Sequence, residues 1–535
     1  GRMTKETGTG AEVTTTDHTY GYDQLGQVTS VNAPNGANTY SYDDRGGLIT
    51  ATGGSGSASF AYDGDGNVTS RVDGAGTATF TYDKGRLVQE KDGLKAATTN
   101  LEYDASGSVK KVDYGYGRVR SYEYDDRGRT TSDTLKNSAG ETVSSITYGY
   151  DVDDRMISKK TTGTAGAAAN TYGYDDAGRL TKWDSGTEST EYGWDDSGNR
   201  VKAGDKTSTF NERNQVQSDG DYTYSYAANG TLSGRTSSGY TEKFTFDAFE
   251  RLINQDGTSY SYDGLDRIDS RGGNTFTYAG ASDGVVSDGT ETYARGAYDE
   301  LLAIQNGSTT SLSLQDQHGD LVANFAASNT TLSTLDDSKA YDPWGQETAS
   351  SGTGHHLATS SWTDPDTDEV NMGDRWYNSA TGSFDSRDPQ TYAGGASILA
   401  NGYTYAAGDP MDLSDPDGNW PSCGWCSKAA SAVSSAVTSA AKTVGSAVRT
   451  AASYTWKAVT YVASKAVSAV KTAAKYVAKA AAKIYNTGKA AISYVVNKVS
   501  QSASYIKQKK PQQQPLTRNR EPRRRRRPRS PTPRP

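Results

Sequence analysis

Two short acidic segments near position 400 contain the residue types that hydrolytic chemistry requires. Asp388 is followed by proline, and Asp415 opens an Asp-Pro-Asp-Gly string, with Arg375 upstream of both. Two carboxylates brought close together cannot both ionise, so one can activate water while the other protonates a leaving amine. Such strings also occur as ordinary turns, and taken alone they predict turns. Their role therefore depends on the elements that position them.

Other reactive residue types form weaker patterns. Cys423 and Cys426 have no surrounding βαβ pattern and no nearby histidine, which favours an incidental pair over a redox or zinc site. Residues 63–67 have the start of a calcium-loop pattern, but Val68 and Gly74 stand where that pattern needs glycine and an acid. We therefore expect no metal and no cofactor.

The composition favours many small strands over one large apolar core. The 535 residues include 36 Tyr and 58 Gly, whereas apolar residues make up only 33%. Amphipathic aromatic side chains can pack short strands while glycine supplies the turns. Because the only two cysteines lie beyond residue 420, we expect strand pairing and burial, without disulfides, to stabilise residues 1–420.

An internal repeat runs through the first half of the chain. Each unit contains aromatic-x-aromatic-Asp, with Leu101 in place of the first aromatic in one unit, then polar residues with glycine, then an aliphatic residue. Its second aromatic recurs every 20 or 21 residues, at positions 22, 42, 62, 82, 103 and 124. Alternation puts both aromatics on one strand face, and Asp with Gly makes the turn, so one unit is a predicted hairpin. Stacked hairpins should propagate as a continuous sheet, with the tyrosines buried in rows.

The repeat consensus Tyr-Asp-x-x-Gly-Arg, seen at residues 124–129 and 174–179, resembles the YD (Rhs) repeats of Rhs toxins, toxin-complex C subunits and teneurins. The segments 313–322 and 341–345 also match this family. The resemblance implies a mainly β fold whose sheet spirals into a hollow shell around an unfolded or partly folded toxin. We divide it into repeats at 1–310 and a closing core at 311–420.

The resemblance also implies a reaction. The Rhs-associated core of this family is resembled by residues 375–389 and 401–405 and by a second signature, the Asp-Pro-Asp-Gly string that opens at Asp415. In the family this core is an aspartyl autoprotease that cuts just after the second signature. We assign Asp388 and Asp415 as the acid pair, Arg375 as the supporting cation and Asn419–Trp420 as the scissile bond.

Three other acids could replace a member of this pair, namely Asp385, Asp412 and Asp417. The sequence departs from the family at Asn419, where leucine is usual, and at Asn378, where aspartate is usual.

The C-terminal segment has a different character. Residues 421–535 carry a net charge of +22, which leaves −30 on residues 1–420. Helical spacing of valine and an i, i+4 lysine stripe from Lys471 to Lys483 predict amphipathic helices at 421–508. The Arg- and Pro-rich residues 509–535 are predicted to be disordered. This tail could bind an anionic membrane, bind nucleic acid, or serve as a spacer to a toxin domain.

Two functional hypotheses follow. In the first, an acidic shell encloses its own basic C-terminal tail and releases it as an effector, in interbacterial or host-directed antagonism, after one intramolecular cut. In the second, the repeats form a structural or adhesive surface protein that binds carbohydrate or partner cells. The first implies a secreted or cell-surface bacterial protein with an immunity protein as a partner. We expect the export signal, the secretion-apparatus region and an N-terminal plug to lie outside this chain.

Overall fold

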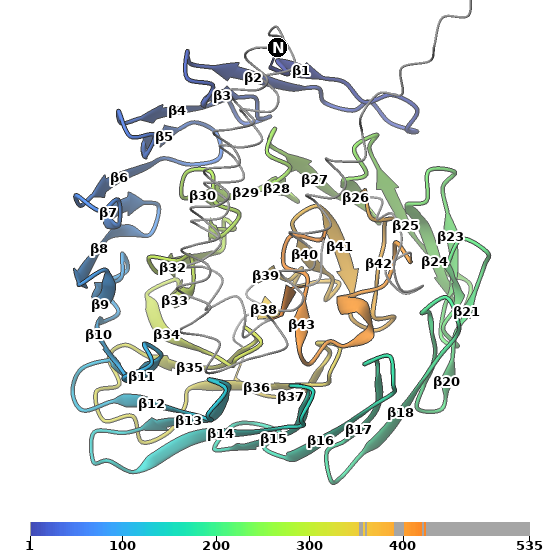
Figure 1. The fold of residues 1–535 in the computed structure, drawn as a ribbon. Coiled ribbons are helices and arrows are strands. Elements are labelled where there is room, and N and C mark those ends of the chain that lie inside the picture. Colours follow the sequence, from blue (N-terminus) through green and yellow to red (C-terminus); the bar gives the residue numbers. More distant parts are fainter. Residues whose placement is uncertain (1, 353–356, 359–360, 390–400, 420–421, 424–535) are drawn as a thin grey trace, which may run out of the picture. The chain divides into compact units, whose positions relative to one another are not determined.

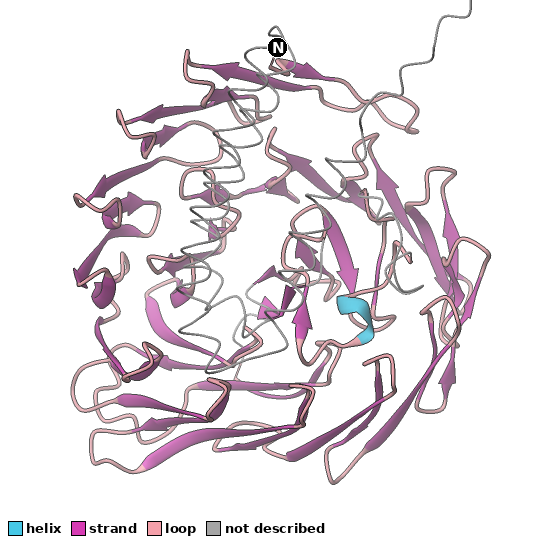
Figure 2. Cartoon of the chain, in the orientation of Figure 1, coloured by secondary structure: helices cyan, strands magenta, loops and turns pink. Residues whose placement is uncertain are grey.

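The computed structural model describes residues 2–352, 357–358, 361–389, 401–419 and 422–423, which all fall within one compact unit spanning Gly1–Ala473. Regular structure in these ranges is almost entirely β (Figure 2). The helix described there is the short 3-10 helix η2 (Ala406–Gly408). Nothing helical in these ranges is long and apolar enough to cross a bilayer. The predicted mainly β fold is confirmed, and the predicted helical and disordered tail lies outside the described residues.

Twenty strands form the first and largest group, and each pairs antiparallel with the next along the chain. These strands are β1 (Lys5–Glu6), β2 (His18–Tyr22), β3 (Val28–Val31), β4 (Asn38–Tyr42), β5 (Leu48–Thr52), β6 (Ala58–Tyr62), β7 (Val68–Asp73), β8 (Gly76–Asp83), β9 (Arg86–Lys91), β10 (Thr98–Tyr103), β11 (Val109–Asp113), β12 (Val119–Tyr124), β13 (Thr130–Lys136), β14 (Thr142–Tyr150), β15 (Met156–Thr162), β16 (Ala169–Tyr174), β17 (Leu180–Asp184), β18 (Ser189–Trp194), β19 (Arg200–Ala203) and β20 (Lys206–Thr207).

Two further groups continue the same hairpin pattern. The nine-stranded group contains β21 (Thr209–Phe210), β22 (Val216–Ser218), β23 (Thr223–Tyr226), β24 (Leu232–Ser237), β25 (Tyr240–Phe246), β26 (Leu252–Gln255), β27 (Thr258–Tyr262), β28 (Ile268–Arg271) and β29 (Asn274–Thr275). The eight-stranded group contains β30 (Thr277–Tyr278), β31 (Val285–Ser287), β32 (Glu291–Arg295), β33 (Leu301–Asn306), β34 (Thr309–Gln315), β35 (Leu321–Ala326), β36 (Asp337–Tyr341) and β37 (Glu347–Ser351).

Short strands complete the described chain. They are β38 (Leu357–Ala358) with β39 (Ser361–Trp362), then β40 (Val370–Met372), β41 (Arg375–Asn378) and β42 (Ser383–Phe384), and finally β43 (Leu413–Ser414) with β44 (Ser422–Cys423).

The expected continuous sheet is interrupted twice, each time by one residue. Ser208 separates β20 from β21, and Phe276 separates β29 from β30. Their amides donate to the carbonyls of Val201 and Asp269, at 2.9 and 3.0 Å. Because these bonds reach back to the preceding hairpin, the interruption is a local irregularity in the ladder, and the hairpin array goes on beyond it.

The repeat turn at residues 125–129 is organised by its aspartate. Asp125 Oδ1 accepts hydrogen bonds from the amides of Arg127 and Arg129, at 2.9 and 3.0 Å, and its Oδ2 accepts one from Arg129 Nε at 2.7 Å. The pairing register shifts between Glu123 and Tyr124, which places a bulge directly before the turn. The Tyr-Asp-x-x-Gly-Arg string therefore encodes a bulge and a turn whose amides the aspartate satisfies.

The tyrosine and the arginine of the consensus link neighbouring hairpins. Tyr124 Oη donates to the carbonyl of Val109 in the preceding hairpin at 2.6 Å. The Arg129 guanidinium lies 4.6 Å from the ring centre of Tyr150 in the following hairpin. The same tyrosine bond recurs along the array, as Tyr42–Val28, Tyr62–Leu48, Tyr103–Leu87, Tyr150–Thr130, Tyr174–Met156, Tyr278–Ile268 and Tyr341–Leu321. The repeat is thus stabilised mainly by its neighbours.

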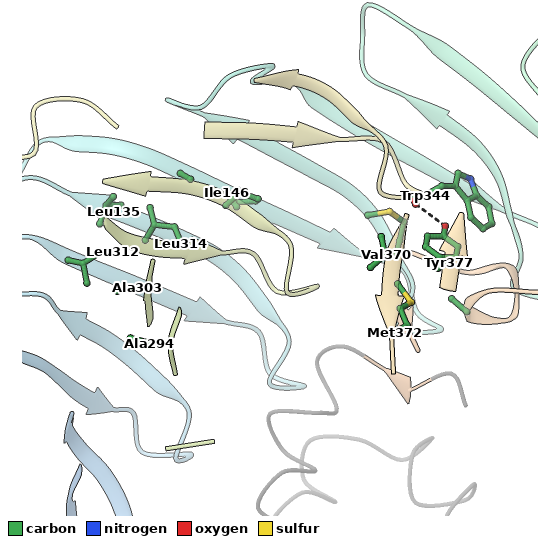
Figure 3. Close-up of a cluster of buried hydrophobic side chains, with 14 of the residues drawn as sticks. Leu135, Ile146, Ala294, Ala303, Leu312, Leu314, Trp344, Val370, Met372 and Tyr377 are labelled. Atoms are coloured by element: carbon green, nitrogen blue, oxygen red, sulfur yellow. Dashed lines mark hydrogen bonds between the residues drawn. The ribbon is translucent and has the colours of Figure 1, made fainter. Parts of the chain in front are cut away.

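A large buried cluster lies between the first and the eight-stranded groups. Leu135 and Ile146, from β13 and β14, share one buried cluster with Leu312 and Leu314 of β34 (Figure 3). The cluster extends to Trp344 and Tyr377, where Tyr377 Oη donates to the Trp344 carbonyl at 2.8 Å. Burial of these side chains against one another joins the repeat strands to the segment that carries the acidic motifs.

Strands β40–β43 lie on the inner side of the curve that the repeat strands follow in Figure 1. Trp376 Nε1 donates to Tyr262 Oη at 3.0 Å, and Asn401 Nδ2 donates to Asn199 Oδ1 at 2.7 Å. The residues flanking the acidic motifs are therefore held by repeat strands that are remote from each other in sequence.

Candidate active site

Arg375 is the centre of the candidate site. It begins β41, and its side chain is only 2% exposed. Its Nη2 lies 3.0 Å from Asp415 Oδ2 and 3.7 Å from Asp388 Oδ2. The structure therefore brings the three residues singled out in the sequence to one buried nitrogen, although they are 40 and 13 positions apart from Arg375.

The other guanidinium atoms of Arg375 bind backbone carbonyls. Its Nε donates to Gly418 O, and its Nη1 donates to Gly402 O at 3.0 Å. The guanidinium carbon lies 3.5 Å from the ring centre of Phe384. The amide of Asp388 also donates to Gly402 O, at 2.8 Å. A buried guanidinium needs such partners, and here they join four chain segments around one cation.

Asp415 contacts the residue that precedes the predicted cut. Its Oδ1 accepts a hydrogen bond from the Asn419 amide at 2.9 Å, while Oδ2 faces Arg375. Asp417 Oδ1 accepts a second bond from the same amide at 3.2 Å. Trp420 lies outside the described residues, so the structure describes the predicted scissile bond from the Asn419 side alone.

The chain pairs with itself across the predicted cut. In the antiparallel pair β43–β44, Leu413 faces Cys423 and Ser414 faces Ser422. Asp415 and Asn419 thus lie in the loop that connects two short strands. A cut in this loop would leave the β43–β44 ladder as a link between the two products.

Asp374 is a further residue of the site that no sequence pattern singled out. Its Oδ2 accepts a hydrogen bond from Asn419 Nδ2 at 2.6 Å, and the Asp417 carbonyl accepts another at 2.9 Å. Asp374, Asp417 and Asn419 line a cavity of about 360 Å³ that is also bordered by Trp362 and Arg295. Asp374 directly precedes Arg375, in the tight turn that joins β40 to β41. This adjacency to Arg375 was the signal in the sequence that could have identified Asp374 as a site residue.

Two of the alternative acids belong to other clusters. Asp385 follows β42, and burial raises its pKa to about 6 beside the buried Glu369. Asp412 accepts the Met156 amide with both oxygens at 3.0 Å, and burial raises its pKa to about 6. The third alternative, Asp417, is exposed and contacts Asn419. In the part of the chain that the structure describes, no set of His, Cys, Asp and Glu side chains is arranged to hold a metal.

Comparison with known proteins places this chain in a family. The family model described as Teneurin YD-shell matches residues 2–137 and 136–411. The tRNA3(Ser)-specific nuclease WapA of Bacillus spizizenii is 24% identical over 363 residues, as is the tRNA nuclease WapA of Bacillus subtilis. Each alignment covers 63% of this chain, and the chain spans about 15% of the length of these relatives.

Solved structures share the fold at lower identity. The structure of TcdB2-TccC3 without its hypervariable C-terminal region superposes with a TM-score of 0.57 at 15% identity, covering 75% of this chain and 25% of that one. The TcdB2-TccC3-Cdc42 structure gives a TM-score of 0.55 at 14% identity, covering 76% and 25%. Because the family model covers well over half of its residues, and the repeat hairpins agree with it, the chain belongs to the Teneurin YD-shell family.

Proposed function

We propose that this chain is the shell of an Rhs-type toxin that encloses its own C-terminal tail and releases it by a single self-cleavage at Asn419–Trp420. The observation that carries the proposal is the convergence of Asp388 and Asp415 on one buried guanidinium nitrogen of Arg375. A turn-only role for the two acidic strings would not require this convergence.

The proposed reaction is hydrolysis of the peptide bond after Asn419. The close ion pair with Arg375 favours the carboxylate form of Asp415, which accepts a proton from water. The water oxygen attacks the Asn419 carbonyl carbon, and Asp388, in its acid form, gives its proton to the departing Trp420 nitrogen. The carbon–nitrogen bond breaks, leaving a carboxylic acid at residue 419, which loses its proton to the now ionised Asp388, and an amine at residue 420.

Charge supports the enclosure. Residues 1–420 carry a net charge of −30, whereas residues 421–535 carry +22. Opposite charges attract the tail to the shell, and this attraction persists until salt or release separates them. The same proposal includes secretion of the protein, a secretion-apparatus region or N-terminal plug, an immunity protein, and contact of the tail with an anionic membrane.

The decisive experiment measures the mass of the purified chain under denaturing conditions. Cleavage yields two species, one ending at Asn419 and one starting at Trp420. Asp388→Asn and Asp415→Asn each remove a titrating group with little change of shape, so we expect cleavage to slow at least about 100-fold. Asp126→Asn, at an exposed repeat turn, is the matched control and should cut like the wild type.

Several outcomes would count against the proposal. A wild-type chain that stays intact overturns self-cleavage for this sequence. Normal cutting in both variants moves the assignment to Asp385, Asp412 or Asp417.

The adhesive function is the second candidate, and exposed aromatic side chains favour it. Tyr116, Tyr240 and Tyr298 are each more than half exposed, and such rings can stack on sugars. This function predicts that an intact chain persists and that the purified repeats bind polysaccharide. Substitution of these three tyrosines by serine should then abolish that binding.

A further inference from the structure

His318 links the repeat array to β43, the strand that ends directly before Asp415 of the candidate site. It lies in the turn between β34 and β35, with its side chain 10% exposed. Its Nδ1 is 3.1 Å from Asp320 Oδ2, and its Nε2 is 3.3 Å from the carbonyl oxygen of Leu413. Leu413 begins β43, two residues before Asp415.

A second contact holds the same segment from the other side. Both carboxylate oxygens of Asp412 accept the Met156 amide of β15, each at 3.0 Å. The Leu413 amide donates to Asp409 O at 3.1 Å. Residues 412 and 413 are therefore fixed between β15 and the β34–β35 turn, and the backbone then runs directly to Asp415.

The surroundings of the ring are mostly acidic. Burial by itself lowers the pKa of His318, but the Asp320 and Asp316 carboxylates and the Leu413 carbonyl together outweigh this effect, and the pKa rises to about 9. At neutral pH both ring nitrogens therefore carry protons and can donate. Asp316, Asp320 and Asp412 interact electrostatically with the ring. Each of these other titratable groups interacts with at least one of the three carboxylates: Lys159, Tyr172, Tyr341, Tyr377, Tyr405 and Asp409.

We propose that His318 is a positioning residue for self-cleavage, because its Nε2–H holds the Leu413 carbonyl and so sets the place of Asp415 against Arg375 and Asn419. The inference rests on the proposed function. It assigns His318 no contact with the reacting atoms. Its role is to maintain the backbone position of the acid, on which a hydrolytic rate depends steeply.

Cleavage kinetics test the inference in the full chain. The intact protein is produced by cell-free synthesis, and its conversion into two fragments is followed over time on denaturing gels. We expect His318→Ala to slow cleavage by about 100-fold and His318→Gln, which keeps one donor, by about 10-fold. His18→Gln is the matched control: this buried histidine also faces carboxylates, on Glu6 and Asp266, but lies in the first repeat hairpins.

The pH profile separates positioning from a general loss of structure. In the wild type, the ring loses its second proton as the pH rises through about 9, so the cleavage rate should fall there. The rate of His318→Gln should show no such step. Hydrogen–deuterium exchange in the non-cleaving Asp388→Asn background gives a second readout, because His318→Gln should speed exchange at the amides of residues 413–419.

The outcomes of the inference and of the proposed function are distinguishable. If the wild type cuts and His318→Gln cuts equally fast, the inference is wrong while the proposed function stands. Unchanged exchange at 413–419 overturns the inference even in a chain that never cuts. An uncut wild type with faster exchange in His318→Gln overturns the proposed function and leaves His318 as an anchor of β43.

Discussion

At the scale of single residues, the candidate site depends on a close approach of backbone to backbone. Gly418 has a φ of 66°, and a Cβ built there would lie 2.3 Å from the carbonyl oxygen of Met372 and 2.9 Å from the amide nitrogen of Arg375. Both contacts involve backbone atoms, which cannot move aside as a flexible side chain can. The bond from Arg375 to the Gly418 carbonyl needs this approach.

Gly418→Ala should therefore displace the loop of residues 415–419 and abolish cleavage while the repeats stay folded. The measurement is fragment formation together with the melting temperature. Gly178→Ala is the control, because Gly178 has a similar φ of 82° but no atom within 4 Å of a Cβ built there. That variant should lose only about 1 kcal/mol of stability and cut normally. Normal cutting by Gly418→Ala would contradict the geometry given for the site.

At the scale of elements, a buried pair of acids lies where β40–β42 meet the repeat strands. Glu369 precedes β40, and Asp385 follows β42. Arg235 of β24 binds Glu369 Oε1 at 2.9 Å, and Asp385 O accepts the Leu232 amide at 2.8 Å. The carboxyl groups of Glu369 and Asp385 lie within hydrogen-bonding reach of each other. One arginine is thus shared by more carboxylates than it can neutralise.

These acids should make the stability of the chain depend on pH. Burial raises the pKa of Asp385 to about 6, and burial with the neighbouring Asp385 charge raises that of Glu369 well above its usual value. The native state therefore binds protons more tightly than the unfolded state. The stabilisation is complete below about pH 4 and decreases as the pH rises through about 6.

Asp385→Asn should remove the part of this dependence that Asp385 contributes, whereas buried Glu369 keeps its own part. We expect the melting temperature of the wild type to fall between pH 5 and pH 7, and that of the variant to fall less. At pH 7 the variant should be the more stable, by up to about 3 kcal/mol. Scanning calorimetry at the two pH values makes the comparison, with Asp126→Asn as the exposed control. A larger fall in the variant than in the wild type would refute this account.

At the scale of the whole molecule, charge is divided between the two ends of the chain. The first 420 residues are strongly acidic, and the remaining 115 carry 23 basic residues and one acid, Glu521. Exposed charges attract over about 10 Å in 0.1 M salt but only about 3 Å in 1 M salt. If charge holds the tail to the shell, their association must weaken as salt is added.

After cleavage, the 420–535 fragment should elute with the shell in 0.1 M sodium chloride and separate from it in 1 M. The attraction depends on the positive charge of the fragment. Replacing Arg523 to Arg527 by serine should therefore lower the salt concentration at which the fragment separates from the shell. Size-exclusion chromatography of the cleaved protein gives the measurement. Co-elution that is unaffected by salt would show that apolar contacts or the β43–β44 ladder, and not charge, retain the fragment.

Local sequence was sufficient to predict the repeat array. The bulge, the turn and the links between hairpins all come from residues within about 20 positions, such as Tyr124, Asp125 and Arg129. Each hairpin contacts mainly its neighbours, so the pattern of one unit predicts the next. The sequence also singled out Arg375, Asp388 and Asp415, because the resemblance to a family supplied their order.

Tertiary structure alone decided which acids share a cation and which do not. Asp385 and Asp388 are three residues apart, yet Asp385 lies beside Glu369 while Asp388 approaches Arg375 at 3.7 Å. Asp374 contacts Asn419, and His318 contacts Leu413. Both contacts depend on the packing of β41, β43 and the repeat turns against one another. Turn and strand preferences act over a few residues, whereas the distance between two carboxylates depends on how buried strands pack, and no local pattern encodes that packing.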